Sequence, residues 1–189
     1  MFIQTEATPN PSTLKFLPGR LVLPEGTAEF RDPADAGRSP LAERLFSVSG
    51  VSGVFLGHDF ISVTKANGEW QHLKPALLGA IMEHFTAGVP VMAERSPGAA
   101  VSADEAEFFD EGDGEIVETI KELIETRVRP AVAQDGGDIT FQGFRDGIVY
   151  LNMRGSCSGC PSSTATLKSG IQNLLRHFIP EVREVQAVS

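Results

Sequence analysis

A short acidic segment at residues 93–113 divides the chain, and no other feature limits the possible folds as strongly. It holds one basic and seven acidic residues, so a net −6 of the chain's −9 lies within it. This composition, together with Pro and Gly, is typical of a linker. The chain has 189 residues, enough for two small domains. We therefore predict an N-terminal domain over residues 1–92 and a C-terminal domain over residues 114–189.

The remaining composition excludes several classes of partner. Hydrophobic residues make up 41% of the chain, which is ordinary for globular domains with packed cores. No apolar stretch approaches the ~20 residues that cross a bilayer. No cluster of Lys and Arg offers a surface for nucleic acid or an anionic membrane, so we predict neither partner. The N-terminal sequence resembles neither a secretory signal nor a transit peptide, which predicts a cytoplasmic protein or an organelle protein already processed.

The N-terminal domain mixes strand and helix patterns. Alternating and β-branched runs indicate strands, and apolar residues four apart indicate a helix. In chain order we predict strands at residues 2–6 and 13–17, a loop over 24–40, a short helix over 41–48, a hairpin over 51–65 and a helix over 73–85. The domain is expected to be α+β.

The C-terminal domain is expected to follow the order α-β-β-α-β. An apolar stripe over residues 116–128 predicts the first helix, which Arg129-Pro130 bends or restarts. Two strands meet at the turn Asp146-Gly147, and an amphipathic helix over residues 167–178 precedes a last strand over residues 182–188. We predict a three-stranded sheet with helices packed on one face. The fold class is therefore α+β, with two small domains joined by an acidic linker.

The only two cysteines, Cys157 and Cys160, lie between a predicted strand and a predicted helix. Two cysteines cannot form the disulfide framework of a small secreted protein, which favours a reduced, intracellular setting. Their spacing lets both sulfurs face one side of a tight loop, and Gly155 and Gly159 permit unusual backbone geometry. Pro161 suits the first position of a helix. Cys160 is therefore expected at a helix N-terminus, where the dipole favours a thiolate and an anionic cluster.

Three kinds of site use such a pair: a dithiol redox centre, a structural zinc site and an iron–sulfur cluster. Zinc and cluster sites need four ligands, and one chain offers two. We interpret His177 as a partner of the helix dipole at the C-terminal end of its helix, and His58, His72 and His84 as surface or satisfied polar residues. None of the four has ligand spacing to the cysteines. If metal is bound, a symmetric dimer that pools two cysteine pairs is the simplest solution. The spacing alone leaves the three chemistries open.

Longer motifs carry a resemblance to a known family. The stretches RPAVAQDGGDITF, VYLNMRGSCSGCPSSTATLKSGIQNLL and IPEVREV, between Val128 and Val185, closely resemble the C-terminal domain of the NifU family, the Nfu-type iron–sulfur proteins. The stretches TEATPNPSTLKFLPG and GVFLGHDFISVTK resemble the domain that precedes it in longer Nfu proteins. The two resemblances cover nearly the whole chain outside the linker.

The resemblance implies a scaffold or carrier rather than an enzyme. It implies a 4Fe-4S cluster bridged between two subunits by Cys157 and Cys160, with a homodimer as the loaded form. Upstream cluster-assembly proteins would supply the cluster and apo iron–sulfur client proteins would receive it. The run from Asp135 to Asp138 is interpreted as a helix-to-strand turn rather than a set of ligands. The N-terminal domain, which lacks cysteine, is expected to recognise clients or to orient the cluster domain.

The alternative function is a dithiol oxidoreductase that uses the same cysteine pair. Such an enzyme is expected to contain a parallel βαβ unit, whereas this C-terminal domain is predicted as helix, hairpin, helix and strand. It also lacks an aromatic residue beside the first cysteine. In the linker, Phe108 and Phe109 are interpreted as a hydrophobic handle that packs against one domain, with a partner-docking motif as the other possibility.

Overall fold

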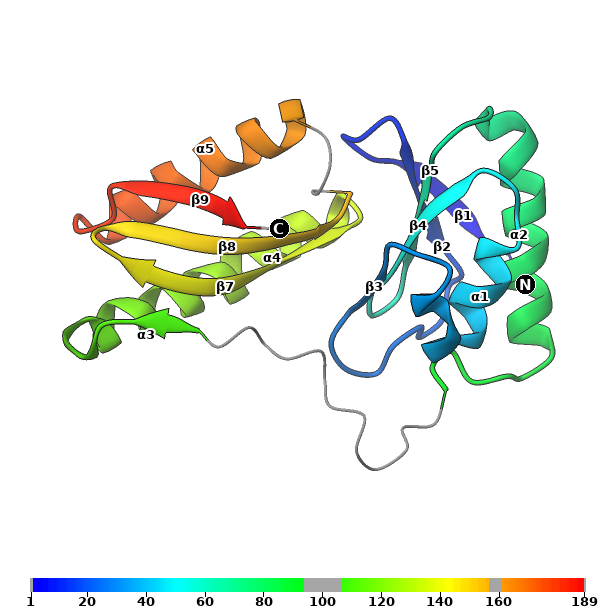
Figure 1. Cartoon of the computed structure of the whole chain (residues 1–189), viewed down its shortest axis with the longest axis horizontal. Coiled ribbons are helices and arrows are strands. Elements are labelled where there is room, and N and C mark those ends of the chain that lie inside the picture. Colours follow the sequence, from blue (N-terminus) through cyan, green and yellow to red (C-terminus); the bar gives the residue numbers. More distant parts are fainter. Residues whose placement is uncertain (1, 94–106, 157–160, 189) are drawn as a thin grey trace. The chain divides into compact units, whose positions relative to one another are not determined.

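The computed structural model describes residues 2–93, 107–156 and 161–188. The chain divides into two compact units, Met1–Gly98 and Ala99–Ser189. Each unit has its own sheet and its own helices (Figure 1). Among the helices that the structure describes, none combines the length and the apolar character that crossing a bilayer requires.

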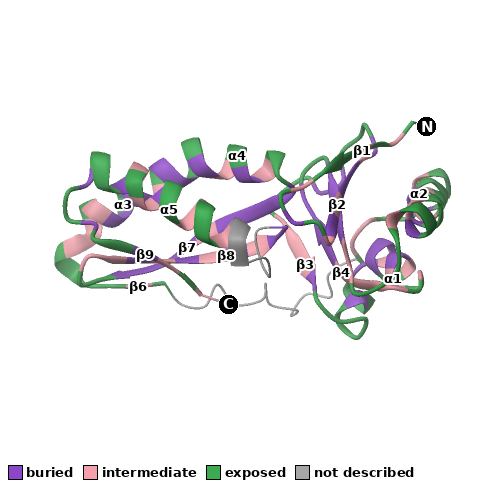
Figure 2. Cartoon of the chain, turned by 90° about the horizontal axis from the view of Figure 1, so that it is seen from above, coloured by how far each residue is buried: buried purple, intermediate pink, exposed green. Residues whose placement is uncertain are grey.

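The first unit is a five-stranded antiparallel sheet of order β1-β2-β5-β4-β3, with two α-helices on one face (Figures 1 and 2). Its strands are β1 (Gln4–Ala7), β2 (Thr13–Leu17), β3 (Ala28–Phe30), β4 (Val51–Leu56) and β5 (Ile61–Lys65). Its helices are the 3-10 turn η1 (Asp35–Arg38), α1 (Pro40–Phe46) and α2 (Trp70–Thr86). Apolar side chains from the sheet and both α-helices form one core, which includes Phe16, Leu41 and Leu77.

The predicted elements of the first unit agree with the structure except between residues 24 and 40. That stretch was expected to be a loop, but it contains β3 and η1. β3 has only three residues and lies at the edge of the sheet, so it is too short to show an alternating pattern. It forms because Phe30 enters the core, where it is fully buried opposite Val54 of β4.

The second unit is a four-stranded sheet of order β6-β7-β8-β9. Its strands are β6 (Phe108–Phe109), β7 (Gly137–Arg145), β8 (Ile148–Gly155) and β9 (Glu184–Val188). Its helical segments are η2 (Glu111–Asp113), α3 (Gly114–Leu123), the π-helical turn η3 (Ile124–Val128), α4 (Arg129–Gln134) and α5 (Pro161–Phe178). Figure 2 shows α3, α4 and α5 on one side of the sheet, with β7 largely buried and the outer sides of the helices exposed.

The order α-β-β-α-β of the second unit agrees with the prediction, but the expected three-stranded sheet is wrong by one strand. The additional strand, β6, comes from the segment that was expected to be linker. It runs parallel to β7, with Phe108 opposite Gly143. The ring of Phe108 lies 5.1 Å from that of Tyr150, measured between centroids. Phe108 thus packs against its own unit as the predicted hydrophobic handle, whereas Phe109 is 41% exposed.

The connection from β8 to β9 corrects one argument made from the sequence. The two strands pair in parallel, and α5 joins them. β8, α5 and β9 therefore form a parallel βαβ unit, with the cysteine pair in the connection between β8 and α5. The expected absence of such a unit was an argument against a dithiol oxidoreductase, and that argument no longer holds. The sequence could not show it because strand direction depends on pairing between distant residues.

Candidate metal centre

Cys157 and Cys160, the predicted cluster ligands, lie outside the described residues. The structure describes the residues on either side of them. β8 ends at Gly155, and α5 begins at Pro161, directly after Cys160 in the sequence. Gly155 has a φ of 69°, a conformation that a residue with a Cβ rarely adopts, as its position before the cysteines predicted. The pair is therefore bounded by a strand and by a helix N-terminus.

The residue before the first cysteine is attached to the turn that follows α4. Ser156 is 1% exposed, and its hydroxyl donates a hydrogen bond to the carbonyl oxygen of Asp135. Its backbone N–H donates to the carbonyl oxygen of Gly136 at 3.4 Å. Gly137, the first residue of β7, pairs with Gly155 in the sheet. The turn over residues 135–138 therefore lies against the chain that enters the cysteine loop.

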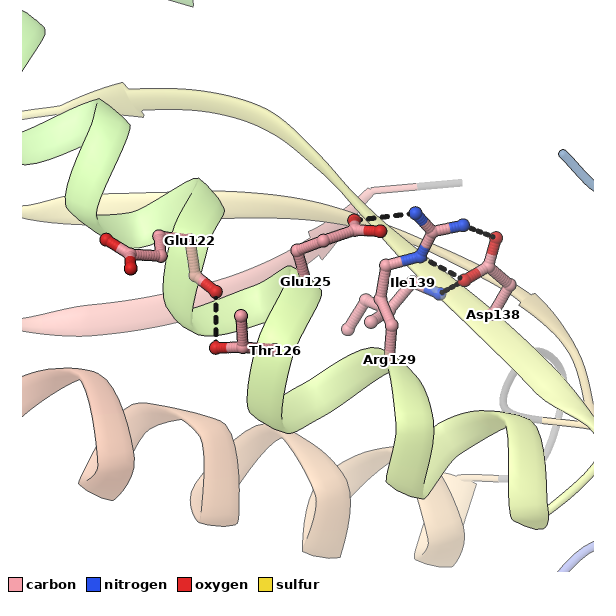
Figure 3. Close-up of polar contacts among 6 residues, drawn as sticks. All are labelled: Glu122, Glu125, Thr126, Arg129, Asp138 and Ile139. Carbon is pink, nitrogen blue, oxygen red and sulfur yellow. Dashed lines mark hydrogen bonds and ion pairs between the residues drawn. The ribbon is translucent and has the colours of Figure 1, made fainter. Parts of the chain in front are cut away.

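An ion pair holds the end of this turn (Figure 3). Arg129, the first residue of α4, binds both carboxylate oxygens of Asp138, with Nε–Oδ1 at 2.9 Å and Nη2–Oδ2 at 3.1 Å. Its Nη1 donates to Glu125 at 2.7 Å. The hydrogen bond to Asp138 raises the pKa of Arg129 above its ordinary value, burial opposes this, and Glu125 adds a smaller increase. The interpretation of Asp135–Asp138 as a turn agrees with these contacts.

The π-helical turn η3 explains why Arg129 is placed there. Pro130 has no N–H to continue an α-helical ladder, so a regular helix would be interrupted at this point. Instead, the N–H of Arg129 donates to the carbonyl oxygen of Ile124, five residues earlier. Ile124 and Val128, the first and last residues of this turn, are both buried in the core of the second unit. The predicted bend at Arg129-Pro130 is thus a π turn.

α5 carries two further ionisable side chains, Lys168 and His177. Lys168 forms an ion pair with Glu184 of β9 at 3.5 Å, and His177 lies in the last turn of α5. Over residues 2–93, 107–156 and 161–188, no group of three or more His, Cys, Asp and Glu side chains could hold a metal ion. Within this part of the chain, therefore, the histidines and carboxylates supply no ligand set.

His84 differs from its interpretation as a surface or satisfied residue. It is fully buried in α2 of the first unit, and neither ring nitrogen has a hydrogen-bond partner within the described residues. Burial lowers the pKa of His84, and the nearby charge of Arg44 lowers it further, while the backbone of Val89 opposes this in part. The burial of His84 was visible in the sequence pattern, since His84 lies three residues after Ile81 on the helix face that enters the core.

Two family models match the chain. One, described as "Scaffold protein Nfu/NifU N terminal", matches residues 3–88, and the other, described as "NifU-like domain", matches residues 120–186. The human protein "NFU1 iron-sulfur cluster scaffold homolog, mitochondrial" is 51% identical over 190 residues, which cover 100% of this chain and 72% of that protein. A Drosophila sechellia protein with the same name is 51% identical, with 100% of this chain and 65% of that protein covered. "NifU-like protein 4, mitochondrial" from Arabidopsis thaliana is 49% identical, with 98% of this chain and 65% of that protein covered.

These names correct one prediction and agree with another. The chain was expected to be cytoplasmic, but the similar proteins from human, fly and plant are all named mitochondrial, which contradicts that prediction. The names describe scaffold proteins, in agreement with the expectation that the chain is not an enzyme. The chain spans 72% of the human protein and 65% of the fly and plant proteins.

Proposed function

Because this chain belongs to the Nfu/NifU family of scaffold proteins, we propose that it carries a 4Fe-4S cluster between two subunits and transfers it to apo-proteins. Cys157 and Cys160 of each subunit supply the four thiolates. The cluster is cargo: it arrives from upstream cluster-assembly proteins and leaves to apo iron–sulfur clients. The observation that carries the proposal is the pair of family matches together with a Cys-X-X-Cys at the start of α5.

The chemistry of the loop suits such a cargo. Iron–sulfur clusters are held by thiolates, and the chain contains two cysteines where a 4Fe-4S cluster needs four. A symmetric dimer supplies the missing pair without any further ligand type. α5 begins one residue after Cys160, and the positive end of a helix dipole stabilises nearby thiolates and an anionic cluster. A cluster held between two subunits by four thiolates is suited to release because separation of the subunits removes half of its ligands.

We assign the two ends of the chain different roles. The C-terminal domain, residues 114–189, binds the cluster. The N-terminal domain, residues 1–92, recognises clients or orients the cluster domain, since it contains no cysteine. Deletion of residues 1–92 is expected to leave cluster binding intact and to slow transfer to at least some clients. Unchanged transfer rates for every client tested would contradict this assignment.

Anaerobic reconstitution with ferrous iron and sulfide tests the proposal. The full chain is expected to bind about four irons and four acid-labile sulfides per two chains. It should then activate an apo acceptor enzyme that requires a 4Fe-4S cluster. Cys157→Ala and Cys160→Ala should each abolish loading, while the control Ser169→Ala, at an exposed position of α5, should load normally. Normal loading of both cysteine variants would overturn the proposal.

The dithiol oxidoreductase remains the second candidate because the cysteine loop lies within a parallel βαβ unit. This function predicts a colourless protein with a reversible disulfide between Cys157 and Cys160 and with disulfide reductase activity. The reconstitution experiment separates the two functions. A colourless monomer with reductase activity supports the oxidoreductase, and a coloured dimer without that activity supports the scaffold.

A further inference from the structure

We propose that Arg129 and Asp138 are positioning residues, which fix the entrance of the cysteine loop through the turn at residues 135–138. The inference rests on the proposed function, since it assumes that Cys157 and Cys160 hold the cluster. It assigns a role to two residues that are not ligands. They fix the position of Ser156, the residue directly before the first ligand, Cys157.

The path from the ion pair to the loop consists of direct contacts. Arg129 binds both carboxylate oxygens of Asp138, and the N–H of Ile139 donates to Oδ1 of the same carboxylate at 2.9 Å. Three residues before Asp138, the carbonyl oxygen of Asp135 accepts the hydroxyl hydrogen of Ser156. Cys157 follows Ser156 in the sequence. The ion pair and the loop entrance are therefore the two ends of one short turn.

The position of Asp138 in the sheet explains why this turn needs a clamp. On one side β7 pairs with β8, with Asp138 opposite Arg154. On the other side β6 pairs with β7 only at Gly143 and Phe144, and no other strand within the described residues pairs with that edge. The carboxylate of Asp138 accepts the N–H of Ile139, and the guanidinium of Arg129 binds the carboxylate. Strand pairing therefore holds the start of β7 along one edge only, the edge that faces β8.

The burial of Asp138 makes the pair sensitive to the loss of either partner. Asp138 is 4% exposed, and a buried carboxylate is tolerated only when it is paired and hydrogen-bonded. Arg129 presents two nitrogens to that carboxylate and a third to Glu125, so its planar fork fixes direction as well as distance. Asn at position 138 keeps the size and one acceptor but loses the charge. Lys at position 129 keeps the charge but loses the fork.

The test compares Asp138→Asn and Arg129→Lys with Ile120→Val, a core variant outside the turn that controls for a general loss of stability. Ile120→Val removes one methylene that α3 contributes to the core of the second unit. The urea concentration is adjusted for each protein so that all have the same folded fraction. Two quantities are measured on the apo full chain: amide hydrogen exchange of Ser156, and the rate at which an aromatic disulfide modifies Cys157 and Cys160. A third, iron release to a chelator, is measured after reconstitution.

Residues behind metal ligands typically change metal affinity 10–100-fold when they are replaced. We expect Asp138→Asn to speed iron release about tenfold relative to the control. It should also speed amide exchange of Ser156 and change the thiol modification rate. Arg129→Lys should lie between wild type and Asp138→Asn. If both variants match Ile120→Val in exchange and thiol rates, the inference is wrong. If wild type binds no cluster, the proposed function fails, while the two apo measurements still decide the role of the ion pair.

Discussion

Replacement of Gly143 by alanine tests how the segment before α3 is attached to the second unit. A Cβ at position 143 would lie 2.6 Å from three ring carbons of Phe108, closer than real Cβ contacts. The φ of Gly143 lies outside the positive region, so the backbone itself accepts alanine. The clash is therefore between the new methyl group and one ring. The Phe108 ring turns away from Tyr150, the sheet shifts, or β6 leaves the edge of β7.

The contacts of β6 set the size of the effect. Overpacking a well-packed site typically costs about 1–3 kcal/mol. Undocking of β6 limits that cost to the free energy of its own contacts. Besides its pairing with β7 and the contact of Arg145 with the Phe108 ring, these contacts include two interactions. They are the Phe108–Tyr150 ring pair, worth about 0.5–1.5 kcal/mol, and the partly exposed ion pair Glu107–Lys121, worth at most about 1 kcal/mol. We expect Gly143→Ala to cost about 1–2 kcal/mol of the second unit's free energy of unfolding.

The double variant makes the prediction specific. Phe108→Ala removes the ring that alanine at position 143 would meet, so Gly143→Ala should cost nothing further in that background. Urea unfolding of the full chain is followed by far-UV circular dichroism for both units. Fluorescence of Trp70, the single tryptophan, reports the first unit alone and serves as the internal control. Additive losses from Gly143→Ala and Phe108→Ala would refute the reasoning, because they would place the cost of alanine elsewhere.

Three further predictions concern pH, packing and metal. Burial lowers the pKa of His84, so the unfolded chain binds the proton more tightly than the folded chain does. The first structural unit should therefore lose stability as pH falls below the ordinary pKa of 6.5, by at most about 1.4 kcal/mol for each pH unit. Melting temperatures of wild type and His84→Leu, measured between pH 8 and 5, should depend on pH with different slopes. Gly57→Ala would place a Cβ 2.3 Å from the ring of Phe60. It should lower the urea concentration at the midpoint of unfolding of the first unit, followed by Trp70 fluorescence. The control Gly79→Ala, with open space around its Cβ, should not lower that midpoint. A chelator should bleach the reconstituted protein without changing its far-UV circular dichroism, because the core of the second unit is built from apolar side chains; unfolding on chelation would indicate a metal-dependent fold.

Local patterns predicted most of the elements, and contacts between distant residues account for the rest. The apolar stripe of α3, the hairpin of β4 and β5, and the alternation of Val149, Leu151 and Met153 are visible because their periods match the faces that they bury. β6 is not visible because two residues form no pattern, and its place depends on Gly143 and Tyr150 more than thirty positions away.

The candidate site was predictable in part for the same reason. The position of the cysteine pair between a strand and a helix follows from local sequence, and the described flanks agree with it. The contact of Arg129 with Asp138 does not follow from any helix or strand period, because a π turn and a tight turn separate the two residues. Pro130 signals that the helix is interrupted, but not that the interruption turns Arg129 toward β7.

The mass of the reconstituted protein under native conditions tests the central claim most directly. Native mass spectrometry of the full chain, loaded anaerobically, should show two chains with one cluster of four irons and four sulfides. Cys157→Ala treated in the same way should give no cluster-bearing dimer. A single chain that carries a complete cluster, or a cluster-bearing dimer that persists without Cys157, would contradict the claim that each subunit supplies half of one site.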